Sequence, residues 1–167
     1  GRVKLIKTDN IIHGVIQLDM DLIASYNGTH IQIWSSITRE KINEMQISIK
    51  IYNDLQTRQL PMIKFIPTII AVGNDKGKII LWNYFTNKVI KKIEAGNGAI
   101  RSLIKSSGCL VSSIEDKDDS LKFHNNHGNH TLVNHNPISS LLHLRKNFVA
   151  GMFTYGQIYI WNLEHNY

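Results

Sequence analysis

Four stretches of the chain share one pattern of hydrophobic and polar positions. Each starts with a short apolar run ending in small residues, passes through a polar turn, and closes with an alternating run that ends on an aromatic side chain. Such alternation has the two-residue period of a β-strand, and no long stretch has a helical period. The stretches are LIASYNGTHIQIW (22–34), IIAVGNDKGKIILW (69–82), LVSSIEDKDDSLKF (110–123) and FVAGMFTYGQIYIW (148–161). We therefore predict an all-β protein.

The closing aromatics recur at a nearly constant spacing. Trp34, Trp82, Phe123 and Trp161 lie 48, 41 and 38 residues apart, close to the ~40 residues of one four-stranded propeller blade. Further strands are expected before the hairpins, at 11–18, 98–106 and 136–144, and after them, at 35–46, 83–95 and 125–135. The longer first interval predicts an insertion or surface connection near 47–59.

The turn within each hairpin has residues suited to a tight reversal. Asn27-Gly28 tolerates positive φ at both positions, and Tyr155-Gly156 places a glycine in the fourth turn. The second and third turns are polar runs, 74–77 and 115–118. In the fourth unit, Ile158 and Ile160 share one face of the last strand while Tyr159 and Trp161 share the other. A blade stacked between two neighbours would bury both faces.

These residues together resemble the WD40 repeat family of β-propellers. The family's third strand ends in Trp-Asp; the counterparts here are Trp34-Ser35, Trp82-Asn83, Phe123-His124 and Trp161-Asn162, and Gly96-Asn97 and Asn134-His135 match the upstream Gly-His pair loosely. The family's buried His, Ser or Thr, Asp and Trp network is incomplete in every unit. The third keeps Ser112 or Ser113 with Asp116, and the fourth keeps His135 and Trp161. The resemblance implies blades held mainly by apolar packing.

The resemblance covers residues 1–167 as a single propeller domain or part of one. The fourth unit stops after its third strand, and the extended segment 2–7 is a candidate for the missing strand. Three arrangements remain open: further blades outside this sequence, a ring completed by another chain, or a ring of four blades closed by segment 2–7. An open arc would expose sheet faces, which a partner must cover.

Charge and cysteine content indicate the cellular compartment of the protein but do not identify its function. The formal net charge is +6, with a denser basic stretch from Lys88 to Lys105. Cys109 is the sole cysteine, so no internal disulfide forms, which fits a reducing compartment, cytoplasmic or nuclear. No run is long enough to span a bilayer, and the first residues lack the apolar core of a signal peptide. We expect an intracellular protein without membrane insertion.

Candidate chemistry is sparse, and we expect neither an enzyme nor a cofactor. The sequence lacks a nucleophile elbow, a phosphate-binding glycine loop and a zinc-protease motif. His124, His127 and His130 have a spacing that invites zinc, but they fall in a predicted turn without acidic or cysteine ligands. The acidic run 115–119 lacks the ligand pattern of a calcium loop. Both stretches are interpreted as polar turns.

The expected function is a non-catalytic protein-interaction scaffold, a subunit of a larger complex. The resemblance implies that partners contact the rim loops. The candidate residues are Asn27, Asn74, Asp75, Lys76, Asn97, Glu115, Asp116, His135 and Tyr155. Tyr84, Phe85 and Lys88 are predicted to form an exposed aromatic and basic patch. Two alternatives stay open: an RNA- or ribosome-associated component that binds through a basic face, and a substrate receptor of a ubiquitin ligase.

Overall fold

A computed structural model describes residues 5–8, 10–47, 60–115, 121–125, 128–132 and 137–163 of the 167. These residues form fifteen β-strands and no α-helix. The strands make four antiparallel sheets in which neighbours in sequence are neighbours in the sheet. This confirms the all-β prediction and the repeating hairpins.

Each sheet is one blade. Blade 1 contains β1 (Gly14–Gln17), β2 (Leu22–Tyr26), β3 (His30–Ser35) and β4 (Lys41–Gln46). Blade 2 contains β5 (Met62–Ile66), β6 (Ile69–Gly73), β7 (Lys78–Asn83) and β8 (Lys88–Glu94). Blade 3 contains β9 (Ala99–Ser106), β10 (Cys109–Glu115), β11 (Leu121–Asn125) and β12 (Gly128–Leu132). Blade 4 contains β13 (Ile138–His143), β14 (Phe148–Phe153) and β15 (Ile158–Asn162).

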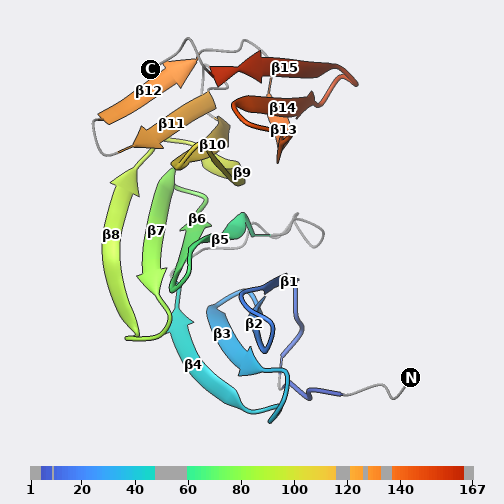
Figure 1. Ribbon diagram of the computed structural model, residues 1–167, viewed down its shortest axis with the longest axis vertical. Helices are drawn as coiled ribbons and strands as arrows, with labels where there is room; N and C mark the ends of the chain where they lie inside the picture. Colours follow the sequence, from blue (N-terminus) through green and yellow to red (C-terminus); the bar gives the residue numbers. More distant parts are fainter. Residues whose placement is uncertain are drawn as a thin grey trace.

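The blades follow one another along an open arc, with blade 1 and blade 4 at its two ends (Figure 1). A separate hydrophobic cluster fills each space between consecutive blades. Ile31 and Ile33 of blade 1 pack with Trp82 of blade 2. Leu81 of blade 2 packs with Leu110 of blade 3. The third cluster joins blades 3 and 4. The core is therefore three layers between sheets, as expected for stacked blades.

The strand register corrects the assignment of the third closing aromatic. Trp34 pairs with Ile23, Trp82 with Ile70, and Trp161 with Val149. In blade 3 the residue at this place is His124, which pairs with Leu110, while Phe123 pairs with Val111 on the opposite face. Phe123 therefore packs toward blade 4, and the histidine occupies the position of the tryptophan.

A buried hydrogen bond supports this equivalence. Trp34 Nε1 donates to Ser25 Oγ over 2.7 Å in blade 1. In blade 3, Ser112 Oγ and His124 Nε2 are joined at 2.8 Å between the same two positions. In blade 3, His124 therefore takes both the position of the tryptophan and its hydrogen bond to the strand serine.

The fourth blade has three strands in the described structure. Leu5, Ile6 and Lys7 form no strand, and this end of the chain lies beside blade 1, far from β15 (Figure 1). Residues 2–4 lie outside the described part, so strand completion by segment 2–7 stays a prediction. The expected insertion near 47–59 falls on residues 48–59, which also lie outside it.

Candidate interaction surfaces

Two asparagines predicted to bind partners hold their own turns together. Asn27 Oδ1 accepts hydrogen bonds from the backbone N–H of Thr29 and of His30, at 3.2 and 2.9 Å. Asn74 Oδ1 accepts from the N–H groups of Lys76 and Lys78, at 3.0 and 2.8 Å. Asparagine is favoured in such turns because its side chain replaces a backbone acceptor. The presence of asparagine at both positions is therefore explained by its structural role in the turn.

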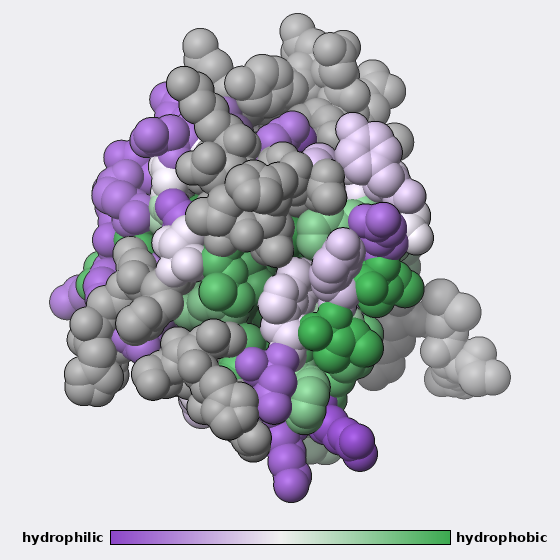
Figure 2. Space-filling model, turned by 90° about the horizontal axis from the view of Figure 1, so that it is seen from above, coloured by the Kyte–Doolittle hydropathy of each residue, from purple (hydrophilic) through white to green (hydrophobic). Residues whose placement is uncertain are grey.

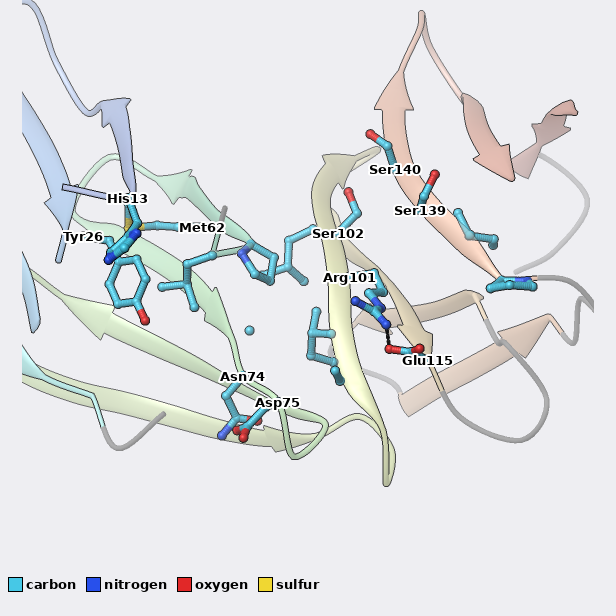
Figure 3. Close-up of a pocket in the computed structure, with 18 of the residues that line it drawn as sticks. His13, Tyr26, Met62, Asn74, Asp75, Arg101, Ser102, Glu115, Ser139 and Ser140 are labelled. Atoms are coloured by element: carbon cyan, nitrogen blue, oxygen red, sulfur yellow. Dashed lines mark ion pairs between the residues drawn. The ribbon is translucent and has the colours of Figure 1, made fainter. Parts of the chain in front are cut away.

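A cavity of about 670 Å³ lies on the concave side of the arc and is lined by all four blades. Of the predicted rim residues it includes Asn74, Asp75 and Glu115; Asn27, Lys76, Asn97 and Tyr155 lie elsewhere. Asp116 and His135 lie outside the described residues. The lining also includes residues that the sequence did not single out, among them His13, Tyr26, Arg101, Ser102 and Ser139 (Figure 3). Strand ends from separate blades bring them together, which no local motif reveals.

Some polar groups of the lining residues have hydrogen-bond or ion-pair partners, and one does not. Arg101 forms an ion pair with Glu115. Tyr26 donates its hydroxyl proton to the Gly28 carbonyl over 2.8 Å, and burial, followed by the charge of Asp75, raises the pKa of this phenol. Asp75 Oδ1, in contrast, is shielded from solvent and has no hydrogen-bond partner among the described residues. One carboxylate oxygen of a lining residue thus has unused hydrogen-bonding capacity, although it is sealed from the solvent in the cavity.

The predicted aromatic and basic patch is only partly exposed. Tyr84 is buried in the cluster between blades 1 and 2, and its hydroxyl donates to the Pro67 carbonyl. Burial raises the pKa of this phenol, with a smaller effect from the charge of Asp19. The expected exposure of Tyr84 is therefore wrong. Phe85 and Lys88 are exposed, as predicted.

The possible metal ligands do not gather. Among the described residues no three His, Cys, Asp or Glu side chains are placed to hold one ion. His124 faces blade 2, where it lines a hollow of about 90 Å³ with Phe65 and Leu81. His127 and the side chain of His130 lie outside the described part.

The end of the arc at blade 4 leaves a sheet face uncovered. We call the face that each blade turns to the next one its forward face. In blades 1, 2 and 3 this face contains Ile31 and Ile33, Ile79 and Leu81, and Leu121 and Phe123, all at most 9% exposed. The same register places Ile158 and Ile160 on the forward face of blade 4, where they are 72% and 62% exposed. Blade 4 has a neighbouring blade on one side only in the described structure, so this face stays open, as expected at the end of an arc.

Other aliphatic side chains extend this uncovered face. Leu142, Ala150 and Ile160 are aligned across the three strands, and Met152 pairs with Ile158. Leu142 and Met152 are exposed too. Figure 2 looks down on the molecule from the side of β12 and β15 and shows hydrophobic side chains reaching the surface between polar ones. Contiguous apolar surface of this kind marks an interaction site.

The opposite end of the arc has different chemistry. On the outward face of blade 1, Glu44 accepts hydrogen bonds from Lys41 and Gln32, at 2.5 and 3.2 Å. The hydrogen bond from Lys41 is the main reason that the pKa of Glu44 lies below its usual value. This face combines Trp34 and Ile23 with a paired set of polar side chains, so its composition differs from that of the aliphatic face of blade 4.

The fold defined by these blades is an arc of a β-propeller. No family model and no curated protein matches the sequence. Solved structures do match the fold. The computationally designed Ika4 protein is similar at a TM-score of 0.73 and 17% identity, covering 97% of this chain and 98% of that one.

WD40 domains are also similar. U3-55K and the RRP9 WD40 repeats each match at a TM-score of 0.75, with 17% and 16% identity and 96% of this chain covered. This chain spans about half of each of those two, 51% of their length. The likeness establishes a propeller fold of the WD40 type. The described residues include no helix of the length and apolarity that crossing a membrane requires.

Proposed function

We propose that this chain is a non-catalytic protein-interaction scaffold, an arc of blades that works as a subunit of a larger complex. The observation that carries the proposal is the uncovered forward face of blade 4. Its residues Ile158 and Ile160 are placed like side chains that are covered in each of the other three blades. An uncovered face whose side chains match those that pack against a neighbouring sheet is evidence that a partner polypeptide binds there.

The partner supported best is a further blade with an apolar face. Sheets stacked in this fold meet through aliphatic and aromatic side chains, as the three internal clusters show. Closing a ring with a second copy would place the aliphatic face against Glu44 and Lys41 of blade 1, and burying that ion pair is costly. The added blade therefore belongs to further polypeptide of the same protein or to a different chain.

Photo-crosslinking from position 158 tests this proposal. With p-benzoylphenylalanine in place of Ile158, we expect the protein isolated from its native cells to crosslink to another polypeptide or to additional blades. The same amino acid in place of Val89, exposed on the outer strand β8, is the matched control and should give no such product. A particle with the mass of the isolated chain and no crosslink from position 158 would contradict the proposal.

A second candidate, RNA binding, is favoured by the outer strand of blade 2. Lys88, Lys91 and Lys92 are exposed along β8, and the exposed ring of Phe85 precedes them. Lysines on an edge strand also prevent edge-to-edge pairing, which accounts for the same pattern without RNA.

Salt dependence separates the two candidates. We expect the complex formed through blade 4 to keep its affinity, within about threefold, between about 50 and 200 mM salt, because its contact is apolar. Binding through phosphate contacts would weaken steeply over that range. Titration of a fluorescent single-stranded oligonucleotide at both salt concentrations, with Lys88→Gln/Lys91→Gln as the comparison, makes the measurement. Tight, salt-sensitive binding that this variant loses would establish the RNA function instead.

A further inference from the structure

A small hollow opens between blades 2 and 3, which are neighbours in the arc (Figure 1). Its volume of about 90 Å³ equals that of roughly three liquid water molecules, at ~30 Å³ each. That space suits a single side chain. Its polar lining residues are Lys91, His124 and Asn125, and its apolar ones are Phe65, Leu81, Ile93 and Leu110. The hollow therefore suits an aliphatic group that lies next to a polar or charged one.

Strand pairing places one lysine of each blade beside the apolar floor. Lys91 pairs with Leu81 across β7 and β8 of blade 2. Lys105 pairs with Leu110 across β9 and β10 of blade 3. The ammonium of Lys105 lies 5.7 Å from the ring centroid of Phe65, which also lines the hollow. The two lysines therefore flank the same apolar floor from opposite blades.

The described charges around this hollow are positive. Lys91 and Lys105 are exposed, and neither forms an ion pair with a described residue. Of the acidic side chains described in blades 2, 3 and 4, Asp75 and Glu115 line the central cavity instead. The third, Glu94, forms an ion pair of 2.9 Å with a lysine of β7. The surface at the hollow is therefore basic and complements an acidic partner.

We propose that this hollow binds one aliphatic side chain from an acidic segment of a partner polypeptide, with Lys91 and Lys105 contacting the carboxylates on either side of it. Burial of the aliphatic side chain supplies most of the affinity. The exposed lysines add less, because water screens such pairs, but they select a negatively charged segment. The site uses residues other than the forward face of blade 4, so it does not rest on the contact proposed there.

RNA fits this hollow less well than an acidic polypeptide does. Single-stranded bases bind by stacking on open aromatic faces. The ring of Phe65 is only partly exposed, and the ammonium of Lys105 lies over it. The other apolar lining residues are aliphatic, so they favour a branched side chain over a base.

Short peptides test the site by NMR in the methyl-labelled full chain. The probe is acetyl-Asp-Glu-Leu-Glu-Asp-amide. One comparison peptide has alanine in place of leucine, and the other has asparagine and glutamine in place of the four acids. We expect the leucine peptide to shift the methyl signals of Leu81, Ile93 and Leu110 saturably and to bind at least about threefold more tightly than either comparison. Unshifted methyl signals, or equal affinity for the leucine peptide and either comparison, would overturn the proposal.

An oligonucleotide provides the competing probe. Hexauridylate has the negative charge of the peptide without an aliphatic side chain, so we expect it to leave the methyl signals of Leu81 and Leu110 unchanged. If it shifted these signals and bound more tightly than the leucine peptide, the hollow would be an RNA site and the proposal would fail.

Lys91→Gln/Lys105→Gln is the decisive variant. It removes both charges beside the hollow, and we expect it to lose at least about threefold in affinity for the leucine peptide. Lys7→Gln/Lys76→Gln removes two exposed charges outside the hollow and should bind as the wild type does. All four lysines are exposed, so both variants should melt within about 4 °C of the wild type. Equal affinities of the two variants would refute the role of the lysines.

A third variant separates this site from the proposed scaffold function. Ile158→Lys/Ile160→Lys alters the forward face of blade 4 and none of the residues that line the hollow. We expect it to bind the leucine peptide with wild-type affinity while losing the partner at blade 4. Loss of peptide binding in this variant would place the peptide on blade 4 and overturn the assignment to the hollow.

Discussion

Replacing Trp82 by alanine is expected to lower the free energy of unfolding by about 3–5 kcal/mol, the usual cost of truncating a large aromatic side chain in a core. Trp82 is 1% exposed and belongs to the cluster that joins blade 1 to blade 2. Its Nε1 also donates to Asn87 Oδ1 over 3.2 Å, tying the strand to the following turn. The alanine would leave a cavity between two rigid sheets, which cannot move together to fill it.

Urea denaturation followed by circular dichroism gives the measurement, because the midpoint shifts in proportion to the lost stability. Phe85→Ala is the control from the same hairpin: its ring is 73% exposed, so its effect should stay within about 0.5 kcal/mol. If the two variants unfolded at the same urea concentration, Trp82 would not be the core of the contact between these blades.

The hairpins of this protein were predictable because their signals are local. Alternation and turn residues such as Asn27-Gly28 place β2, β3 and the turn between them correctly. Strand β5, which follows the long connection, was not singled out, because no repeat of its own pattern marks 62–66. A local pattern therefore locates a strand reliably only where the same pattern recurs in the other repeat units.

Face assignments were harder, since a shift of one residue exchanges the two faces of a strand. The preference for an aromatic at the strand end selected Phe123, whereas strand pairing places His124 beside Ser112. The sequence contained a usable signal: a serine in the preceding strand, as Ser25 is for Trp34. The burial of Tyr84 was also hard to predict, because the side chain of a turn residue can pack into the cluster between two blades.

The candidate site was only partly predictable, because it is assembled across blades. The turn containing Asp75 was recognised as a rim loop, yet nothing local distinguishes Asp75 from Asn74. The distinction arises because Asn74 Oδ1 accepts the N–H groups that shape the turn, while Asp75 Oδ1 is buried without a hydrogen-bond partner among the described residues. Likewise, Arg101 and Glu115 meet by pairing of β9 with β10, which requires the register of the sheet.

Gly77→Ala is expected to destabilise the protein by about 2–5 kcal/mol, through two separate costs. Gly77 has φ +71°, a left-handed conformation that costs an L-residue roughly 1–2 kcal/mol. A Cβ at this position would also overlap with the carbonyl of Gly96 and lie 2.9 Å from the carbonyl oxygen of Gly98. These are backbone atoms that cannot rotate away, and overpacking of this kind adds about 1–3 kcal/mol.

Gly156→Ala separates the two costs. Gly156 has φ +81° in the equivalent turn of blade 4, but a Cβ there would meet no atom within 4 Å. It should therefore lose only the roughly 1–2 kcal/mol of the backbone conformation. Gly77 further accepts hydrogen bonds at its carbonyl from the N–H groups of Ala95 and Gly96, at 2.8 and 3.1 Å, so displacing it also disturbs the end of β8. Thermal unfolding of the two variants side by side measures the difference. Equal melting temperatures would show that the close approach of residues 77 and 96 does not hold this rim of blade 2.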